Sequence, residues 1–141
     1  MRNIIFVAKT TGLECLEFHL RTFENNENFI VVMEPNKDEI KGYLNERSMQ
    51  FIDIDNFSID LLRGHCFDWL LNLWGGHIFK QDMLNMVKNS LNIHPSYLPY
   101  GRGRDPVVWA IRNHHPAGVT LHKINEKVDE GGNLVPRTKI I

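Results

Sequence analysis

Short apolar runs separated by amphipathic stretches are the feature that most limits what this chain can fold into. Residues 4–8, with the sequence IIFVA, form the first run, and residues 29–33 and 69–74 form two more. A strand that is apolar along its whole length is buried on both faces, which is typical of the inner strands of a parallel sheet. Residues 49–54 and 91–93 predict two further strands.

The stretches between these runs have helical periodicity. The first of them has apolar residues at intervals of three and four, namely Leu13, Leu16, Leu20 and Phe23. This spacing predicts a helix over residues 12–24, with Thr11 as its N-cap. Further helices are expected over residues 37–47, 59–63 and 80–88. Strands and helices that alternate at this spacing predict right-handed crossovers.

We therefore expect an α/β fold over residues 1–141: a Rossmann-like, doubly wound, mostly parallel sheet with flanking helices. The 16 basic and 17 acidic residues leave a net charge of −1, so no overall field would attract nucleic acid or anionic lipid. No apolar run approaches the ~20 residues that span a bilayer. Cys15 and Cys66 form no CxxC motif, and no signal peptide is in view, so a cytoplasmic location is expected.

A polar pair closes the last predicted strand of the first half. Asn92 and His94 are two positions apart, and the period of a strand places both side chains on the same side of the sheet. An amide donor beside an imidazole suits acyl chemistry, because one group can hold a developing oxyanion while the other moves a proton. The alternative interpretation is that the pair is a structural cap.

A second polar segment follows the GVTLH strand at residues 118–122. There Asp129 stands before a glycine turn, and a carboxylate near His94 would hold its tautomer. The alternative role for Asp129 is turn formation. No metal site is expected, because the histidines lack compact ligand spacing: His94, His114, His115 and His122.

Together these segments resemble the formyltransferase family that uses 10-formyltetrahydrofolate. Its hallmarks are an Asn-x-His-Pro-Ser-x-Leu-Pro stretch, an Arg-Gly loop, a Gly-Val-Thr-x-His strand and an Asp-x-Gly turn. They correspond here to residues 92–99, 102–103, 118–122 and 129–131, with order and spacing both in agreement. Residues 1–90 match only in their order of strands and helices. Within the family the chain is most similar to sugar N-formyltransferases, which act on the amine of a nucleotide-linked amino sugar.

The resemblance implies a catalytic triad of Asn92, His94 and Asp129. Asn92 would stabilise the oxyanion when the substrate amine attacks the formyl carbon. His94 would help with that charge and with removal of the amine proton, and Asp129 would orient the imidazole. Thr120 would lie behind the site and order a water or the loop.

The same resemblance implies two sets of binding residues. The folate donor would contact the turn after the fourth strand and the segment before the Asp-x-Gly turn, at Gly76, His77, Ile78, Phe79, Ile124 and Asn125. The nucleotide-linked amino sugar would contact Tyr97, Tyr100, Arg102 and Trp109.

Two departures from the family pattern concern the end of the chain. Gly132 and Asn133 follow the Asp-x-Gly turn, Pro136 interrupts the next strand, and the chain ends about twelve residues past Asp129. We therefore expect one catalytic domain that is truncated at its C-terminus. Two alternatives remain open: a non-catalytic domain that binds folate or a nucleotide sugar without turnover, and an α/β module that binds zinc or a partner.

The C-terminal residues also predict self-association. Residues 134–141 would form a strand at the sheet edge, and an exposed apolar edge strand tends to pair with another chain. The segment contains four apolar residues: Leu134, Val135, Ile140 and Ile141. A twofold homodimer is the simplest result. The alternative is a monomer whose last strand is protected by Arg137 and Lys139.

Overall fold

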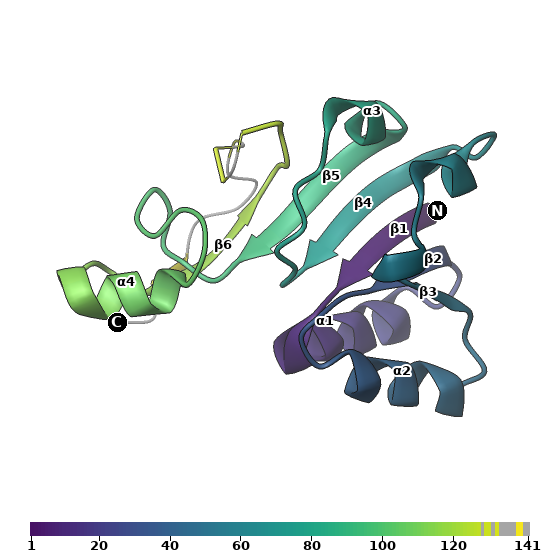
Figure 1. The fold of residues 1–141 in the computed structure, drawn as a ribbon, viewed down its shortest axis with the longest axis horizontal. Coiled ribbons are helices and arrows are strands. Elements are labelled where there is room, and N and C mark those ends of the chain that lie inside the picture. The colour runs from purple at the N-terminus through teal and green to yellow at the C-terminus, as the bar shows by residue number, and fades with distance from the viewer. Residues whose placement is uncertain (128, 131, 133–137, 140–141) are drawn as a thin grey trace.

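A twisted sheet with the strand order β3-β2-β1-β4-β5-β6-β7 forms the centre of the molecule (Figure 1). The computed structural model describes residues 1–127, 129–130, 132 and 138–139. The strands are β1 (Arg2–Val7), β2 (Glu27–Val32), β3 (Phe51–Asp53), β4 (Phe67–Leu73), β5 (Val87–His94), β6 (Gly118–His122) and β7 (Thr138–Lys139). The helices are α1 (Lys9–Thr22), α2 (Lys37–Glu46), α3 (Gln81–Leu84) and α4 (Pro106–Asn113), and two 3-10 turns lie at Ile54–Asn56 and Ile59–Leu62.

The sheet is parallel from β3 to β5 and antiparallel from β5 to β7. The expected α/β fold with a mostly parallel sheet is confirmed. The register aligns Asn72 of β4 with Asn92 of β5, and Asn92 with His122 of β6. Three polar residues thus form one row across three adjacent strands.

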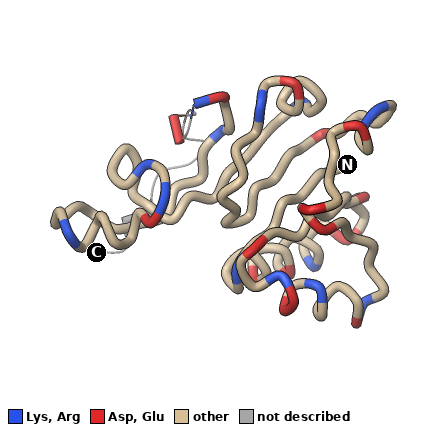
Figure 2. The backbone as a smooth tube through the Cα atoms, in the orientation of Figure 1, with Lys and Arg blue, Asp and Glu red and all other residues tan. Residues whose placement is uncertain are grey.

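Apolar residues cover both faces of the sheet. On one face, Leu16 of α1 and Leu44 of α2 pack against Ile5 and Val7 of β1. On the other face, Phe6 packs with Leu62 of the second 3-10 turn, Phe79 of the segment between β4 and α3, and Met83 of α3. The charged residues lie mainly on the helices and loops rather than on the strands (Figure 2). In the described part of the chain, no helix has the length and apolarity needed to cross a membrane.

Several element boundaries differ from the prediction, among them the start of α1 and the end of α3. α1 begins at Lys9 with Ala8 at its N-cap position and no side-chain cap, so the prediction of Thr11 as cap is wrong. The predicted helix over residues 80–88 is only α3, because Val87 and Lys88 already belong to β5, where Val87 is aligned with Phe67 of β4. The β-branched Val87 suits a strand.

The end of the sheet partly matches the predicted edge strand. β7 pairs with β6 alone and is the edge strand of the sheet. Residues 134–137 and 140–141, on which the self-association prediction also depends, lie outside the described residues. The homodimer therefore stays a prediction.

Candidate active site

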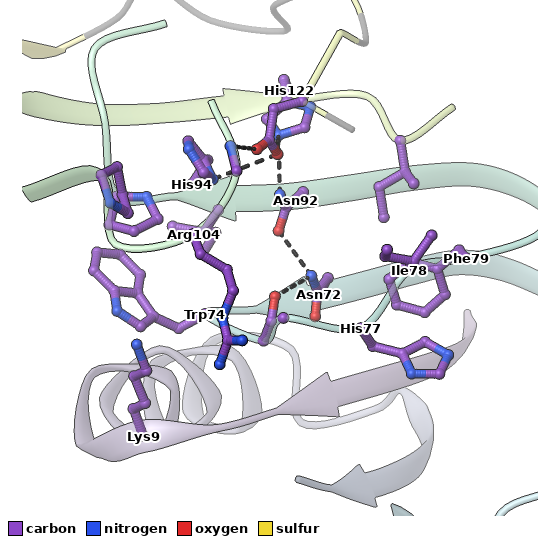
Figure 3. A pocket seen from close by; sticks show the side chains of 18 of the residues that line it. Lys9, Asn72, Trp74, His77, Ile78, Phe79, Asn92, His94, Arg104 and His122 are labelled. Atoms are coloured by element: carbon purple, nitrogen blue, oxygen red, sulfur yellow. Dashed lines mark hydrogen bonds and ion pairs between the residues drawn. The ribbon is translucent and has the colours of Figure 1, made fainter. Parts of the chain in front are cut away.

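A cavity of about 470 Å³ opens at the carboxyl ends of β4 and β5 (Figure 3). The parallel strands β1, β4 and β5 all have their carboxyl ends at this edge of the sheet, so the side chains and loops that follow them converge here. The size is typical of a small-molecule site. Both Asn92 and His94 line the cavity, as do His122 and Asp129.

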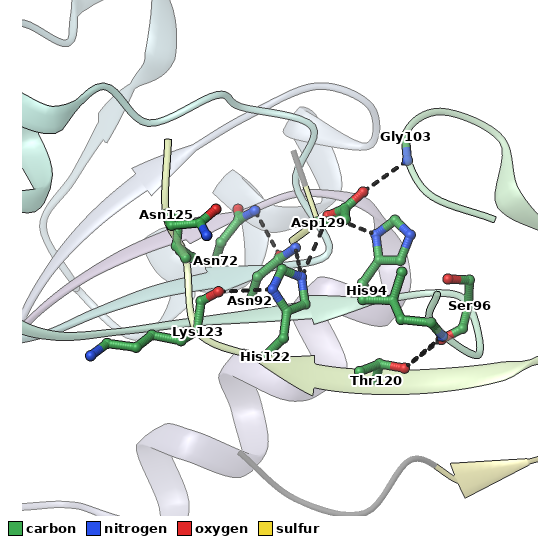
Figure 4. A network of polar contacts seen from close by, with 12 residues as sticks. Asn72, Asn92, His94, Ser96, Gly103, Thr120, His122, Lys123, Asn125 and Asp129 are labelled. Atoms are coloured by element: carbon green, nitrogen blue, oxygen red, sulfur yellow. Dashed lines mark hydrogen bonds and ion pairs between the residues drawn. The ribbon is translucent and has the colours of Figure 1, made fainter. Parts of the chain in front are cut away.

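The three predicted catalytic residues lie together at this cavity (Figure 4). His94 Nδ1 is 3.4 Å from Asp129 Oδ1, and both side chains are about 8% exposed. The other ring nitrogen, His94 Nε2, is 2.9 Å from the carbonyl oxygen of Gly101. Asn92 lies two positions before His94 in β5 and is also buried. The arrangement places an amide, an imidazole and a carboxylate around one space.

Asp129 is held from two sides. Its Oδ2 accepts a hydrogen bond of 2.8 Å from the Gly103 amide, and its backbone has the left-handed φ of 53°. The left-handed backbone at Asp129 is compatible with a turn, and its carboxylate lies near His94, so its catalytic role stays a prediction. Burial raises the pKa of the Asp129 carboxyl, but its polar contacts, the Gly103 amide among them, and the charge of His94 lower that pKa by more. The group is therefore an anion at neutral pH.

Thr120 fixes the segment that follows His94. Its hydroxyl donates to the carbonyl oxygen of Ser96 at 2.7 Å and accepts from the backbone amide of Leu98 at 3.2 Å. Thr120 lies opposite His94 in the β5–β6 register. It thus orders the loop, as the resemblance implied.

Two further polar residues complete the site: Asn72, which the sequence analysis did not name, and His122, which it considered only as a metal ligand and as part of the GVTLH strand. Asn72 Nδ2 donates to Asn92 Oδ1 at 2.9 Å, and Asn92 Nδ2 is 2.9 Å from His122 Nε2. Asn72 is a polar residue inside an apolar strand, and His122 is two positions from Thr120 on the same face of β6. Both signals were present in the sequence, but neither residue type points to a role without its neighbours.

All six predicted donor-binding residues line the cavity: Gly76, His77, Ile78, Phe79, Ile124 and Asn125. The His77 ring stacks on Phe6 with a centroid separation of 5.3 Å, and burial lowers the pKa of His77. Phe79 is buried in the core beneath this part of the cavity wall, whereas Ile78 is exposed. These residues give the cavity a mostly apolar stretch of wall, and Glu126 and Lys127 line it next to Asn125.

The four predicted sugar-binding residues do not line the cavity. Tyr100 packs on His115 with a centroid separation of 5.0 Å, and Arg102 pairs with Glu130 at 3.3 Å. Trp109 lies on the exposed side of α4, next to Arg112, and Tyr97 is half-buried outside the cavity. Their substrate role stays a prediction.

Three residues that the sequence analysis did not name line the cavity. Lys9 follows β1, Trp74 follows β4, and Arg104 comes from the loop before α4 (Figure 3). Neither the Lys9 ammonium nor the Arg104 guanidinium has a hydrogen bond or ion pair with another described residue. These two cations and the indole can contact an anionic, planar ligand, although the acidic Glu34 and Asp105 line the cavity as well. Within the described ranges, no three His, Cys, Asp or Glu side chains gather as metal ligands.

Comparison with known proteins agrees with this geometry. The sequence model of the family described as "Formyl transferase" matches residues 70–140, which is half of the chain. Methionyl-tRNA formyltransferase from Borreliella burgdorferi (strain ZS7) is 33% identical over 103 residues, which cover 70% of this chain and 33% of that protein. The chain thus spans about a third of the length of this curated relative.

Two solved structures share the fold. Glycinamide ribonucleotide transformylase 1 from Symbiobacterium toebii is similar with a TM-score of 0.79 and 19% identity, over 100% of this chain and 74% of that one. The formyltransferase PseJ from Anoxybacillus kamchatkensis, in complex with UDP-4,6-dideoxy-4-formamido-L-AltNAc and tetrahydrofolate, has a TM-score of 0.63 and 22% identity, over 100% and 61%.

Proposed function

This chain belongs to the formyltransferase family, and we propose that it transfers a formyl group from 10-formyltetrahydrofolate to the amine of a nucleotide-linked amino sugar. The observation that carries the proposal is the meeting of Asn92, His94 and Asp129 at one cavity. Residues 76–79 give the lining an apolar slot, and Lys9 and Arg104 give it a part, called here the cationic end, that Glu34 and Asp105 also line. Two substrates can therefore bind with their reacting atoms beside the three polar residues.

The donor supplies a formyl carbon, which the substrate amine attacks; a new C–N bond forms, and the bond from that carbon to N10 of the folate breaks. Asn92 donates an amide N–H to the formyl oxygen as negative charge develops there. Because His94 Nε2 donates to the Gly101 carbonyl, it is Nδ1 that accepts the proton that the amine loses, and that proton ends on N10 of the departing folate. Asp129 stabilises the protonated His94 ring, to which it lies 3.4 Å away.

The slot after β4 is the proposed place for the pterin of the donor. His77 and Ile78 present apolar surface, and Gly76 leaves its backbone open, because a Cβ there would meet no atom within 4 Å. A flat heterocycle needs such a surface and backbone hydrogen bonds. Tetrahydrofolate bound to PseJ, which shares the fold, supports a folate donor for this chain.

The cationic end is the proposed place for the acceptor. Lys9 and Arg104 can neutralise the phosphates of a nucleotide-linked sugar, and the Trp74 indole can stack on a ring. PseJ, whose complex contains a UDP-linked formamido sugar, supports this class of acceptor. The relatives also include proteins named for methionyl-tRNA and glycinamide ribonucleotide, so the test must compare all three amines.

The test offers purified protein 10-formyltetrahydrofolate and three amines in separate reactions: a UDP-linked 4-amino sugar, glycinamide ribonucleotide and methionyl-tRNA. Tetrahydrofolate release and the mass of the formamide product are measured. We expect turnover with the amino sugar alone. Turnover only with another amine would overturn the acceptor assignment. Folate binding without turnover of any amine would favour the non-catalytic alternative.

A further inference from the structure

We propose that Asn72 and His122 are positioning residues that fix the direction of the Asn92 amide. The relay starts at the Gly75 carbonyl oxygen, which accepts from Asn72 Nδ2 at 2.9 Å. It continues through the Asn72–Asn92 and Asn92–His122 contacts, each 2.9 Å long. It ends at the Lys123 carbonyl oxygen, 2.9 Å from His122 Nδ1 (Figure 4). Its kinetic consequences rest on the proposed function, but its geometry does not.

The two backbone carbonyls give the relay one direction, because a carbonyl oxygen can only accept. At one end, the atom of Asn72 that faces Gly75 must be the NH₂ group. That same nitrogen faces Asn92, so the Asn92 atom that it meets must be the oxygen. Asn92 therefore turns its own NH₂ group toward His122.

The other end of the relay gives the same answer. His122 Nδ1 must carry a proton to bond to the Lys123 carbonyl, which leaves Nε2 as the acceptor of a neutral ring. Nε2 then accepts from the Asn92 amide. Both ends of the relay thus require one orientation of Asn92 and one tautomer of His122.

Asp129 does not disturb this arrangement. Its Oδ1 is 3.4 Å from His122 Nε2, but that nitrogen cannot accept from Asn92 and donate to Asp129 at the same time. The shorter Asn92 contact decides its role. Asp129 is thus left to Gly103 and His94, and the two histidines have different tasks.

The direction of the amide decides what Asn92 can do. One of its two N–H groups is used by His122, and the other has no partner among the described residues and can donate into the cavity. A reversed amide would instead present its oxygen to the developing negative charge. Reversal would thus replace a stabilising donor by a repulsive acceptor.

A second observation argues that Asn72 is present for more than stability. Its Oδ1 is buried without a hydrogen-bond partner among the described residues, and a buried unsatisfied acceptor lowers the stability of the fold. The space beside it depends on Gly75, where a Cβ would lie 2.6 Å from that oxygen. An apolar residue in β4 would avoid this cost but could not direct Asn92.

The first test measures the His122 tautomer in the ligand-free protein by ¹⁵N NMR of the imidazole nitrogens, with His122→Gln used to assign the signals. We expect a protonated Nδ1 and a bare Nε2 at neutral pH. A proton on Nε2 would overturn the relay. This readout does not depend on activity, so it decides the relay even if no amine is formylated.

The second test compares two pairs of variants in the formyl transfer assay. Asn72→Leu removes the donor to Asn92, whereas Leu71→Ala disturbs the buried core on the opposite face of β4. His122→Phe removes the acceptor, whereas His122→Gln can still offer a carbonyl oxygen to Asn92. Folding of each variant is checked by circular dichroism and its stability by urea denaturation.

We expect kcat to fall in Asn72→Leu and His122→Phe, with KM nearly unchanged. Loss of one oxyanion donor lowers kcat by about 10²-fold to 10³-fold, which is the upper limit of the expected effect. We expect Leu71→Ala to lose stability but keep kcat, and His122→Gln to keep more kcat than His122→Phe. Equal kcat in the His122 pair, or a kcat in Asn72→Leu that matches Leu71→Ala, would overturn the positioning role. If these variants do not fold, the measurement of the His122 tautomer still tests the relay.

Discussion

His94 is the residue on which the proposed chemistry depends most directly. Both of its ring nitrogens face acceptors, Asp129 and the Gly101 carbonyl, so its ring is held in place on two sides. We predict that His94→Asn lowers kcat by about 10²-fold to 10⁴-fold, because general acid–base help is lost. Formamide production in stopped assays measures the effect, and circular dichroism checks the fold. Near-normal turnover would contradict the assignment of His94.

Lys9 tests the acceptor end of the cavity. Because its ammonium has no ion-pair partner among the described residues, it is available to a phosphate. We predict that Lys9→Gln raises KM for the nucleotide-linked amine severalfold with little change in kcat, since a phosphate contact would hold the substrate equally in the ground state and in the transition state. Lys80→Gln, at an exposed lysine outside the cavity, is the matched control. Equal KM values in the two variants would refute a phosphate contact at Lys9.

Individual residues differ in how well the sequence predicts them. Asn92, His94 and Asp129 lie in motifs with a fixed order, and they meet in the structure as the resemblance implied. Lys9 and Arg104 are separated by most of the chain, and only the folded sheet brings their loops to one cavity. Tyr97 and Trp109 stand near the motif in sequence, but the α4 segment carries Trp109 outward.

At the scale of elements, one acidic residue joins α2 to the end of β3. Asp53 bonds to Lys37 at 2.6 Å and to Lys41 at 2.5 Å. These two bonds from lysine hold the pKa of the Asp53 carboxyl well below its usual range, and they raise the pKa of Lys37. The contribution of Asp53 to stability is therefore fully present above the unfolded-state pKa of about 3.9 and is lost as pH falls further.

We predict that Asp53→Asn lowers the urea midpoint at pH 7 and pH 5, and that the gap to the wild-type midpoint narrows at pH 3. The reason is that the Asp53 carboxyl of the unfolded chain, with its ordinary pKa of about 3.9, is largely protonated at pH 3, whereas the pKa of the native carboxyl lies well below that range, so the lysine contacts stabilise the native state by less. Urea denaturation at the three pH values measures the gap. A gap of constant size down to pH 3 would show that the Asp53 charge does not cause it.

The contact of α1 with β4 depends on Gly12. A Cβ at Gly12 would lie 2.5 Å from the Leu73 carbonyl oxygen, which cannot move without breaking the sheet. We predict that Gly12→Ala destabilises the protein by about 1–3 kcal/mol, as overpacking does. Gly42→Ala in α2, where a Cβ would meet no atom within 4 Å, should instead stabilise by about 0.5–1 kcal/mol. Urea denaturation compares the two, and a shift of equal sign would refute the close contact.

Element boundaries follow from such contacts, which explains why the sequence places them imperfectly. Periodicity located α1 and α2 because each buries a stripe of leucine and isoleucine residues. It extended α3 over Val87, since a valine one turn from Met83 also fits a helix. Val87 instead belongs to a strand because it pairs with Phe67 of β4, which is distant from it in the sequence.

For the whole molecule, the strand order explains where the cavity lies. β1 is followed by a helix that leads to β2 on one side, and β4 lies against its other side, so the chain direction across the sheet reverses between β1 and β4. Lys9 follows β1 and Trp74 follows β4, on either side of this reversal. Ligands of open α/β sheets bind at such a switch point. The alternation of elements predicts the sheet, but the position of the reversal requires the strand order.

Binding of the donor at this edge of the sheet should stabilise the whole fold. A ligand that binds only the native state adds about 2.7 kcal/mol of stability at a concentration of 100 times its Kd. We predict that 5-formyltetrahydrofolate, a stable analogue of the donor, raises Tm by several degrees in differential scanning fluorimetry. Ile78→Asp is the matched control, because Ile78 is 66% exposed and its replacement costs little stability while it places a charge in the slot. The variant should keep its own Tm but lose the shift. A shift of equal size in both proteins would place the folate elsewhere, and no shift with the wild-type protein at millimolar analogue would contradict the donor assignment.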